Sequence, residues 1–188
     1  MSIQYLDSVR RLFMMYKQLG EKAIAQIDDK DLNWQANEDS SSIVTIIQHL
    51  WGNMLSRWTG FLTTDGEKPW RKRDAEFEND MVDRATLLKK WEEGWQCLFN
   101  ALNSITDGDL DRIIYIRNEG HTILEAINRQ IAHYSYHVGQ IVYISKLHSK
   151  EEWKSLSIPR NKSDEYNTGK FSQEKQKKNF TDDWIEKK

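Results

Sequence analysis

The stretch INRQIAHYSYHVGQIVYISK, residues 127–146, is the part of this 188-residue chain that decides its expected fold. Its apolar residues recur every three or four positions, the spacing that gathers side chains on one face of a helix. This stripe consists of Ile127, Ile131, Tyr134, Val138, Ile141 and Val142. Upstream, Thr122 and Glu125 have the spacing of a capping box, which satisfies backbone N–H groups at a helix start. We therefore predict a helix from Thr122 to about His148.

Three further segments have the same helical periodicity of apolar residues. They run from Ile3 to about Ile27, from Ile43 to near Gly66, and from Arg84 to about Ile105. Ser41 or Ser42 can begin the second of these helices by accepting a hydrogen bond from an otherwise unpaired backbone N–H. Only 2 Pro and 9 Gly occur in the chain, which favours helices because proline is excluded from helix interiors. We therefore predict an all-α fold.

The connections between these helices differ in character. Asp28 to Ser42 is rich in Asp, Asn and Ser, which favour loops. Asp65 to Asp83 contains Pro69 and dense charge, and its length of about 20 residues favours an exposed lid or crossover over a tight hairpin. Arg112 to Arg117 is β-branched and aromatic and precedes a turn signal, which predicts a short strand and hairpin. Together these features predict a four-helix bundle with a long crossover loop and a β-hairpin before the last helix.

We expect two regions in the chain, the bundle at residues 1–148 and a polar C-terminal tail at residues 149–188. The tail is rich in Lys, Glu, Ser and Asn, yet it contains five aromatic side chains, more than disordered segments usually carry. These are Trp153, Tyr166, Phe171, Phe180 and Trp184. The favoured interpretation is a solvated, partly docked or disordered tail with a few anchored side chains. The alternative is an arm that packs on the domain or on a second subunit.

Composition excludes several classes of function. The 27 Lys and Arg residues nearly balance 29 Asp and Glu residues, so there is no basic surface of the kind that binds nucleic acid. A single cysteine, Cys97, cannot form an intramolecular disulfide, which favours a reducing compartment. No apolar run approaches the roughly 20 residues that span a bilayer, and the charged N-terminus does not resemble a signal peptide. We expect a cytoplasmic protein that binds neither nucleic acid nor membrane.

The histidines carry the strongest signal of a functional site. His133 and His137 are four residues apart, so both imidazoles lie on one face of the last long helix. At about 100° per residue, this pair lies roughly 100° from the apolar stripe. His49 lies in the same angular sense beside the stripe of the second helix. Three imidazoles could therefore converge at the edge of the bundle on one cation that still meets solvent. Such ligands suit Zn²⁺, Ni²⁺ or Fe²⁺ rather than Mg²⁺ or Ca²⁺.

Other interpretations of the histidines stay open at this point. His49 could form a local hydrogen bond, with the other two forming a polar flank. His148 is explained by a favourable interaction with the helix dipole. His121 is favoured as a turn residue, although it could support a ligand or contact a substrate. The helices contain no Glu-x-x-His pattern, which a di-iron carboxylate site needs twice.

Motifs of other chemistries are missing from the sequence. There is no glycine-rich phosphate loop, no G-x-S-x-G elbow and no H-E-x-x-H, so nucleotide and serine-hydrolase functions lack a motif. Cys97 lies near the apolar face of its helix, where a free cysteine usually behaves as a small hydrophobe. Trp70, beside Pro69 in the charged connection, is the tryptophan expected to be exposed, where it could touch a ligand or partner.

Three segments resemble a known family. IIQHLWGNMLSRW (residues 46–58), IRNEGHTILEAINRQIAHYSYHVGQ (116–140) and EYNTGKFS (165–172) are similar to the DinB-like superfamily of metal-binding bundles, in particular its DUF1572 branch. The resemblance extends from about Ile3 to Phe171. It implies a four-helix bundle with up-down-down-up order, frequent homodimers and three histidines that bind a divalent metal. Carried over to this sequence, the metal ligands are His49, His133 and His137.

The resemblance also suggests an activity. Some relatives in the superfamily are transferases that join a low-molecular-weight thiol, such as bacillithiol or mycothiol, to an electrophile, and others are isomerases of thiol adducts. The first hypothesis is therefore a metal-dependent thiol S-transferase, with a bound water or thiolate as nucleophile. Tyr134, Tyr136, Asn53 and Gln130 could line the approach to the metal. The second hypothesis is a non-catalytic, dimeric metal-binding or stress-response protein whose tail binds a partner.

Overall fold

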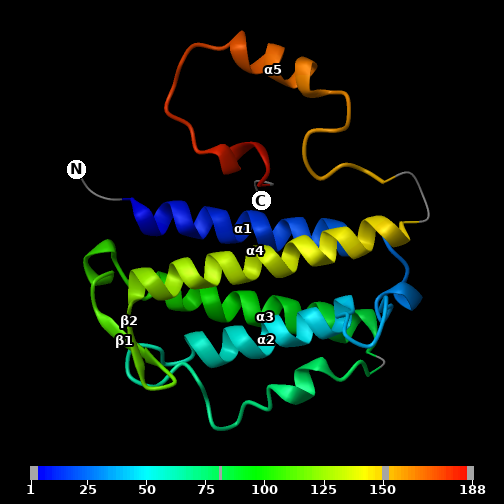
Figure 1. The fold of residues 1–188 in the computed structure, drawn as a ribbon. Coiled ribbons are helices and arrows are strands. Elements are labelled where there is room, and N and C mark those ends of the chain that lie inside the picture. Colours follow the sequence, from blue (N-terminus) through cyan, green and yellow to red (C-terminus); the bar gives the residue numbers. More distant parts are fainter. Residues whose placement is uncertain (1–3, 81, 150–152, 186–188) are drawn as a thin grey trace.

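The computed structural model describes residues 4–80, 82–149 and 153–185, and its fold is mostly helical (Figure 1). The five α-helices are α1 (Tyr5–Ile24), α2 (Ile43–Trp58), α3 (Arg84–Asn103), α4 (Ile123–His148) and α5 (Ser163–Phe171). The strands β1 (Ile113–Ile116) and β2 (Glu119–Thr122) pair antiparallel. The all-α class and the hairpin before α4 are thus confirmed. No helix in the described ranges has the length and apolar character needed to cross a membrane.

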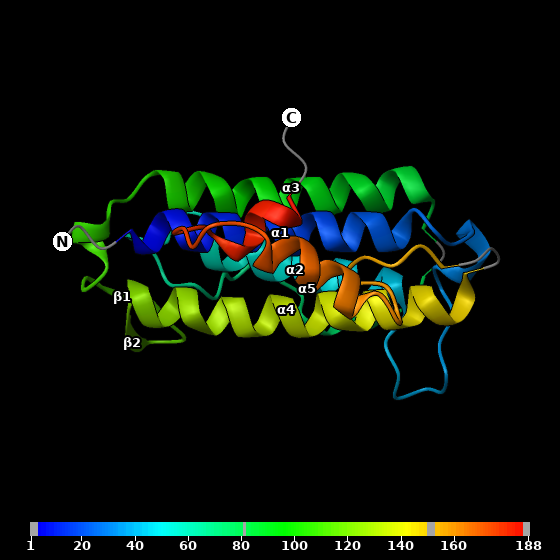
Figure 2. The same ribbon diagram turned by 90° about the horizontal axis from the view of Figure 1, so that it is seen from above.

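The four long helices lie side by side, as Figure 1 shows and Figure 2 repeats from above. α1 packs mainly against α4, and α2 packs mainly against α3. α2 also contacts α4 and a short 3₁₀ helix, η2 (Asp74–Phe77), which belongs to the connection between α2 and α3. In Figure 1 this connection returns along α2 towards the start of α3. The helix α2 therefore has both α4 and η2 as neighbours.

Side-chain caps mark the starts of three helices, and those of α2 and α4 were predicted. The Ser42 hydroxyl accepts from the Thr45 backbone N–H at the start of α2, and the Asp83 carboxylate accepts from Thr86 at the start of α3. Thr122 and Glu125 form both hydrogen bonds of a capping box at the start of α4. These bonds satisfy N–H groups that have no partner within the helix. The local sequence therefore sets where these three helices begin.

The predicted helix ends are less accurate. The prediction that the second helix continues to near Gly66 is wrong, because Thr59 is extended and Gly60 adopts a φ of +57°. Glycine enters this left-handed region at little cost, and one such residue ends a helix. Phe61, which continued the apolar periodicity, is buried from the following turn instead. The first helix spans 5–24 rather than 3–27, and Ile3 lies outside the described residues.

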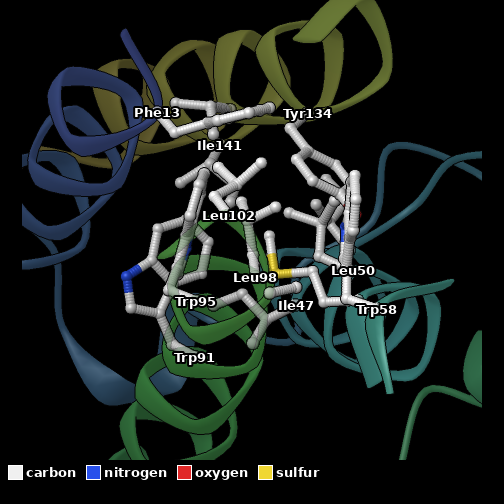
Figure 3. Packing of buried hydrophobic residues seen from close by; sticks show 14 of the residues in the cluster. Phe13, Ile47, Leu50, Trp58, Trp91, Trp95, Leu98, Leu102, Tyr134 and Ile141 are labelled. Carbon is white, nitrogen blue, oxygen red and sulfur yellow. The ribbon is translucent and has the colours of Figure 1, made fainter. Parts of the chain in front are cut away.

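The core between the long helices is rich in aromatic side chains, as Figure 3 shows. The ring of Tyr134 lies 5.8 Å from the rings of both Phe13 and Trp95, measured between centroids. Its hydroxyl accepts a hydrogen bond from Trp58 Nε1 and donates one to Asn53 Oδ1, each at 3.1 Å. The expectation that Tyr134 could line the approach to a metal is wrong. Its position on the apolar stripe directs it into the core, where its hydroxyl is fully used.

Removing this hydroxyl should weaken the core. We expect Tyr134→Phe to lower the free energy of unfolding by about 1–3 kcal/mol, because Trp58 and Asn53 would each lose a buried partner. Chemical denaturation followed by circular dichroism measures this change. Tyr136→Phe is the matched control, since Tyr136 is 62% exposed, and it should change stability by no more than about 0.5 kcal/mol. Equal stability of the two variants would contradict the role given to the hydroxyl.

The described part of the tail contains α5 and a short 3₁₀ helix, η4 (Phe180–Asp183). In Figure 1 this part of the chain lies beyond α1, on the side away from α2 and α3. η4 contacts α1, where the Asp182 carboxylate lies 2.7 Å from Arg11 Nη1 and Thr181 is buried. By contrast, α5 contains no buried residue. The tail thus combines a docked turn with an exposed helix.

Candidate metal centre

The three histidines singled out from the sequence meet at the contact between α2 and α4. His49 comes from α2, and His133 and His137 come from successive turns of α4. His133 Nε2 lies 3.1 Å from His49 Nε2 and 3.2 Å from His137 Nε2. The three potential ligand atoms lie within 4.8 Å of one another, a cluster that could hold a metal ion. Elsewhere in the described ranges, no other three His, Cys, Asp or Glu residues gather in this way.

Hydrogen bonds on the far side of two rings determine which nitrogens carry protons. His49 Nδ1 lies 2.9 Å from Glu76 Oε2, and His137 Nδ1 lies 2.8 Å from Gln140 Oε1. Carboxylate and amide oxygens only accept hydrogen bonds, so each Nδ1 donates, and in the neutral form of either ring Nε2 carries a lone pair. Both lone pairs face His133 Nε2. One proton on that nitrogen cannot satisfy both neighbours fully, whereas a single cation can accept all three nitrogens. The donor set therefore fits a metal.

The rings are held in the neutral form that metal binding needs. Burial, followed by the neighbouring charges of His137 and His49, lowers the pKa of His133 to about 3. Burial also lowers the pKa of His137 to about 4, against the opposing hydrogen bond to Gln140. A metal ligand must offer an unprotonated nitrogen. At neutral pH these two rings are therefore ready to bind without losing a proton first.

Glu76, the partner of His49, belongs to η2 and was missed from the sequence. Its carboxylate also accepts from Arg71, with Nε 2.7 Å from Oε1 and Nη2 2.8 Å from Oε2. Burial alone would raise the pKa of Glu76, but the hydrogen bonds from Arg71 and His49 outweigh it and hold the pKa below its usual range. Glu76 therefore stays ionised and orients His49, as carboxylates do for many metal-binding histidines.

The connection between the second and third helices is largely exposed, as predicted, but two of its side chains are buried against α2. The side chains of Arg71 and Glu76 are only 2% and 9% exposed, because their ion pair packs against α2. The signal available in the sequence was indirect. A metal-binding histidine usually has a carboxylate or carbonyl partner, and the connection holds several acidic residues close along the chain to His49. Trp70 in the same connection is exposed, as predicted.

Gly52 makes room for Glu76. A Cβ atom at this position would lie 2.8 Å from Glu76 Cδ and closer still to Oε1. We expect Gly52→Ala to push the carboxylate away from His49 and to lower metal affinity about tenfold. Gly139→Ala is the matched control, because its Cβ would meet nothing within 4 Å. That change should leave metal affinity unaltered and raise stability by about 0.5–1 kcal/mol. Competition titration with a metal-binding dye measures the affinities; equal values would contradict the steric argument.

The other residues considered as site candidates lie apart from the triad or point elsewhere. His121 is not in a turn, since it sits in β2 opposite Ile114. His148 is in the last turn of α4, where its ring lies 4.4 Å from that of Trp34 and its Nδ1 is 3.5 Å from Asp31. Burial raises the pKa of the Cys97 thiol, which agrees with an unreactive apolar role. None of these three side chains is placed to join the triad.

Of the residues expected to line the approach, Tyr136 is the one at the surface. Its ring lies 5.0 Å from that of His137. On the other side, Phe77 of η2 lies 5.0 Å from the His49 ring. Asn53 Oδ1 accepts a hydrogen bond from the Tyr134 hydroxyl inside the core, and Gln130 is buried. Aromatic rings thus flank the triad, while His133 and His137 keep partial exposure to solvent.

Comparison with protein families confirms the DUF1572 part of the sequence resemblance, over a range that ends before the EYNTGKFS segment. A family model described as "Protein of unknown function (DUF1572)" matches residues 1–162. The chain belongs to the DUF1572 family. All three histidines, Glu76 and Gly52 lie within the part that matches DUF1572, whereas α5 begins just after it. A search of curated proteins found no match. The DUF1572 assignment therefore identifies the family and leaves its activity to be inferred from the site.

Proposed function

We propose that this DUF1572 protein is a divalent-metal-dependent enzyme that joins a low-molecular-weight thiol to an electrophile. Its metal ligands are His49, His133 and His137. The observation that carries the proposal is the convergence of three Nε2 atoms, two of them with their lone pairs fixed by Glu76 and Gln140. The donor set favours Zn²⁺, Ni²⁺ or Fe²⁺, since imidazole prefers borderline cations.

We also assign the fold to the DinB-like superfamily, as an up-down-down-up four-helix bundle. In Figure 1, α1 and α4 run in one direction and α2 and α3 run in the other. The long connection between α2 and α3, which contains η2, is what allows two consecutive helices to point the same way. This order supports the assignment because it places α2 beside α4, and these are the two helices that carry the three histidines.

The number of ligands supports catalysis over a structural role. Structural zinc sites usually have four protein ligands, whereas catalytic sites have three and an open position. Here the described cluster has three members, of which His133 and His137 are only partly buried. A cation in this place would supply a Lewis acid that lowers the pKa of a bound thiol. The protein's own contribution is to hold His49 through Glu76 and to shelter one side with Phe77.

The test is a screen of thiols on metal-loaded and metal-stripped protein. Bacillithiol, glutathione and coenzyme A would each be mixed with a chromogenic electrophile, and adduct formation followed by absorbance. We expect at least one thiol to react faster with loaded protein than with stripped protein, and no acceleration with the His133→Ala variant. If loaded and stripped protein give equal rates with every thiol, the proposal of a thiol transferase is wrong.

A second candidate function is a non-catalytic, dimeric metal-binding or stress-response protein. The observation that favours it is an exposed apolar stripe along α4 formed by Tyr136, Tyr143 and Leu147, which are 55–65% exposed. Residues at this spacing share a helix face, and such a face is suited to pairing with a second copy. Analytical ultracentrifugation tests this pairing by measuring the molecular mass in solution. We expect the wild type to be a dimer and Tyr143→Ser to dissociate more readily.

A further inference from the structure

Gln130 is a buried amide whose oxygen accepts no hydrogen bond within the described part of the chain. It is 2% exposed, and its Oε1 has no partner. Gln130 precedes His133 by three residues and His137 by seven, so it lies on the same face of α4 as both ligands. A buried amide without a partner is costly, because it gives up its hydrogen bonds to water and gains none. Such a group beside a candidate metal site is therefore available to a ligand.

Arg57 of α2 is a second buried side chain with an unused polar atom. It is 6% exposed, and its Nη1 donates to the Gly66 carbonyl oxygen and lies 3.3 Å from Glu67 Oε2. Its Nε has no partner. Because Glu67 already faces its charge, the guanidinium has a buried N–H donor without a partner, at Nε, rather than a charge left uncompensated. A neutral acceptor would satisfy that donor.

The helix register brings these two groups to the same level. α2 and α4 run in opposite directions in Figure 1, and the hydrogen bond between Asn53 and Tyr134 marks one level of their contact. Arg57 is one turn beyond Asn53, and Gln130 is one turn before Tyr134. Moving one turn in opposite directions along antiparallel helices reaches the same level. Gln130 also lies one turn before His133 on α4, which places this level next to the triad.

We propose that Arg57 and Gln130 form a subsite that binds an amide group of the thiol substrate. The substrate's carbonyl oxygen accepts from Arg57 Nε, and its N–H donates to Gln130 Oε1. This pairing uses the two buried atoms that lack a partner, the Nε donor of Arg57 and the Oε1 acceptor of Gln130. It rests on the proposed function for the identity of the substrate as a thiol, but the two residues are not metal ligands. The site would therefore select amide-containing thiols over simple alkyl thiols.

The sharpest test compares two thiols that differ in a single group. N-methyl-3-mercaptopropanamide and methyl 3-mercaptopropionate have the same size, but only the amide has an N–H to donate to Gln130. NMR titration of the full chain would give a dissociation constant for each thiol, with Zn²⁺ and after its removal. We expect about tenfold tighter binding of the amide in both states, because a site built for a donor rejects an analogue that lacks it.

The variant Gln130→Met removes the acceptor while keeping the length and flexibility of the side chain. We expect it to bind both thiols equally, with metal binding unchanged. Gln96→Met, on the exposed surface of α3, should keep the tenfold preference. If Gln130→Met does not fold, Arg57→Lys provides the second variant, and it should weaken the amide and the ester alike because both offer a carbonyl oxygen.

The outcomes separate the subsite from the proposed function. Equal constants for amide and ester in the wild type would mean that Arg57 and Gln130 do not bind the amide group, and would overturn the subsite. Tighter binding of the free carboxylate 3-mercaptopropionate than of the amide would overturn it as well, in favour of an anion site. If Zn²⁺ does not bind but the amide preference persists, the proposed function fails and the subsite stands.

Discussion

Replacing His133 with alanine is expected to abolish stoichiometric binding of divalent metal while the protein stays folded. His133 Nε2 is the central atom of the cluster, within 3.2 Å of both other ligand nitrogens. Its loss leaves only two potential metal ligands, His49 and His137. The side chain lies at the flank of α4 and is only partly buried. We therefore expect the free energy of unfolding to change by about 1 kcal/mol or less. Elemental analysis of purified protein measures the metal content.

The control for this experiment is His121→Ala, which removes an imidazole from β2 rather than from the triad. It should keep the metal content of the wild type. Circular dichroism on all three proteins checks that the helices persist. Equal metal content in the wild type and in His133→Ala would show that the triad is not the metal site, and would remove the basis of the proposed function.

Replacing Glu76 with glutamine is expected to affect both metal affinity and stability. The change keeps the shape of the side chain but removes the charge that orients His49, and the loss of such partners usually lowers metal affinity about 10–100-fold. It also leaves the buried Arg71 guanidinium facing a neutral group. Breaking a buried ion pair on one side costs about 3–5 kcal/mol. Competition titration with zinc and chemical denaturation measure the two effects separately.

Glu78→Gln is the matched control, since Glu78 is exposed and lies two residues further along the same connection. It should resemble the wild type in both measurements. A Glu76→Gln variant that keeps full metal affinity but loses stability would show that Glu76 serves the fold alone. The opposite result would show that Arg71 finds another partner, and that Glu76 acts on the metal site only.

The parts of the fold that could be predicted from the sequence are those with a repeating local signal. The apolar periodicity located the four long helices, and the Thr122–Glu125 pair located the start of α4 within one residue. The same periodicity brought His133 and His137 onto one flank, and a similar angle on α2 selected His49. Helix geometry alone relates residues three and four apart, so these predictions needed no knowledge of tertiary structure.

The parts that could not be predicted depend on segments that are distant in the chain. Glu76 reaches His49 across 27 positions, and no periodic pattern links a connection to a neighbouring helix. Gly52 leaves the space that the Glu76 side chain fills, but the sequence shows only a glycine inside a helix and gives no sign of which residue it accommodates. The predicted end of α2 was too late because the apolar periodicity continues through Phe61, whereas the positive φ of Gly60 ends the helix before it. Tyr134 was misassigned because its hydroxyl suggested a site residue, although its place on the apolar stripe indicated the core, where Trp58 and Asn53 bind that hydroxyl.

The two arms of the triad are separated by 84 positions along the polypeptide. During synthesis, a nascent chain that has been translated only as far as α3 contains His49 but neither His133 nor His137. It therefore lacks two of the three ligands. Ion capture by the triad would therefore wait until α4 has been synthesised and has docked against α2. An occupied site would then mark a molecule in which α4 has already packed against α2.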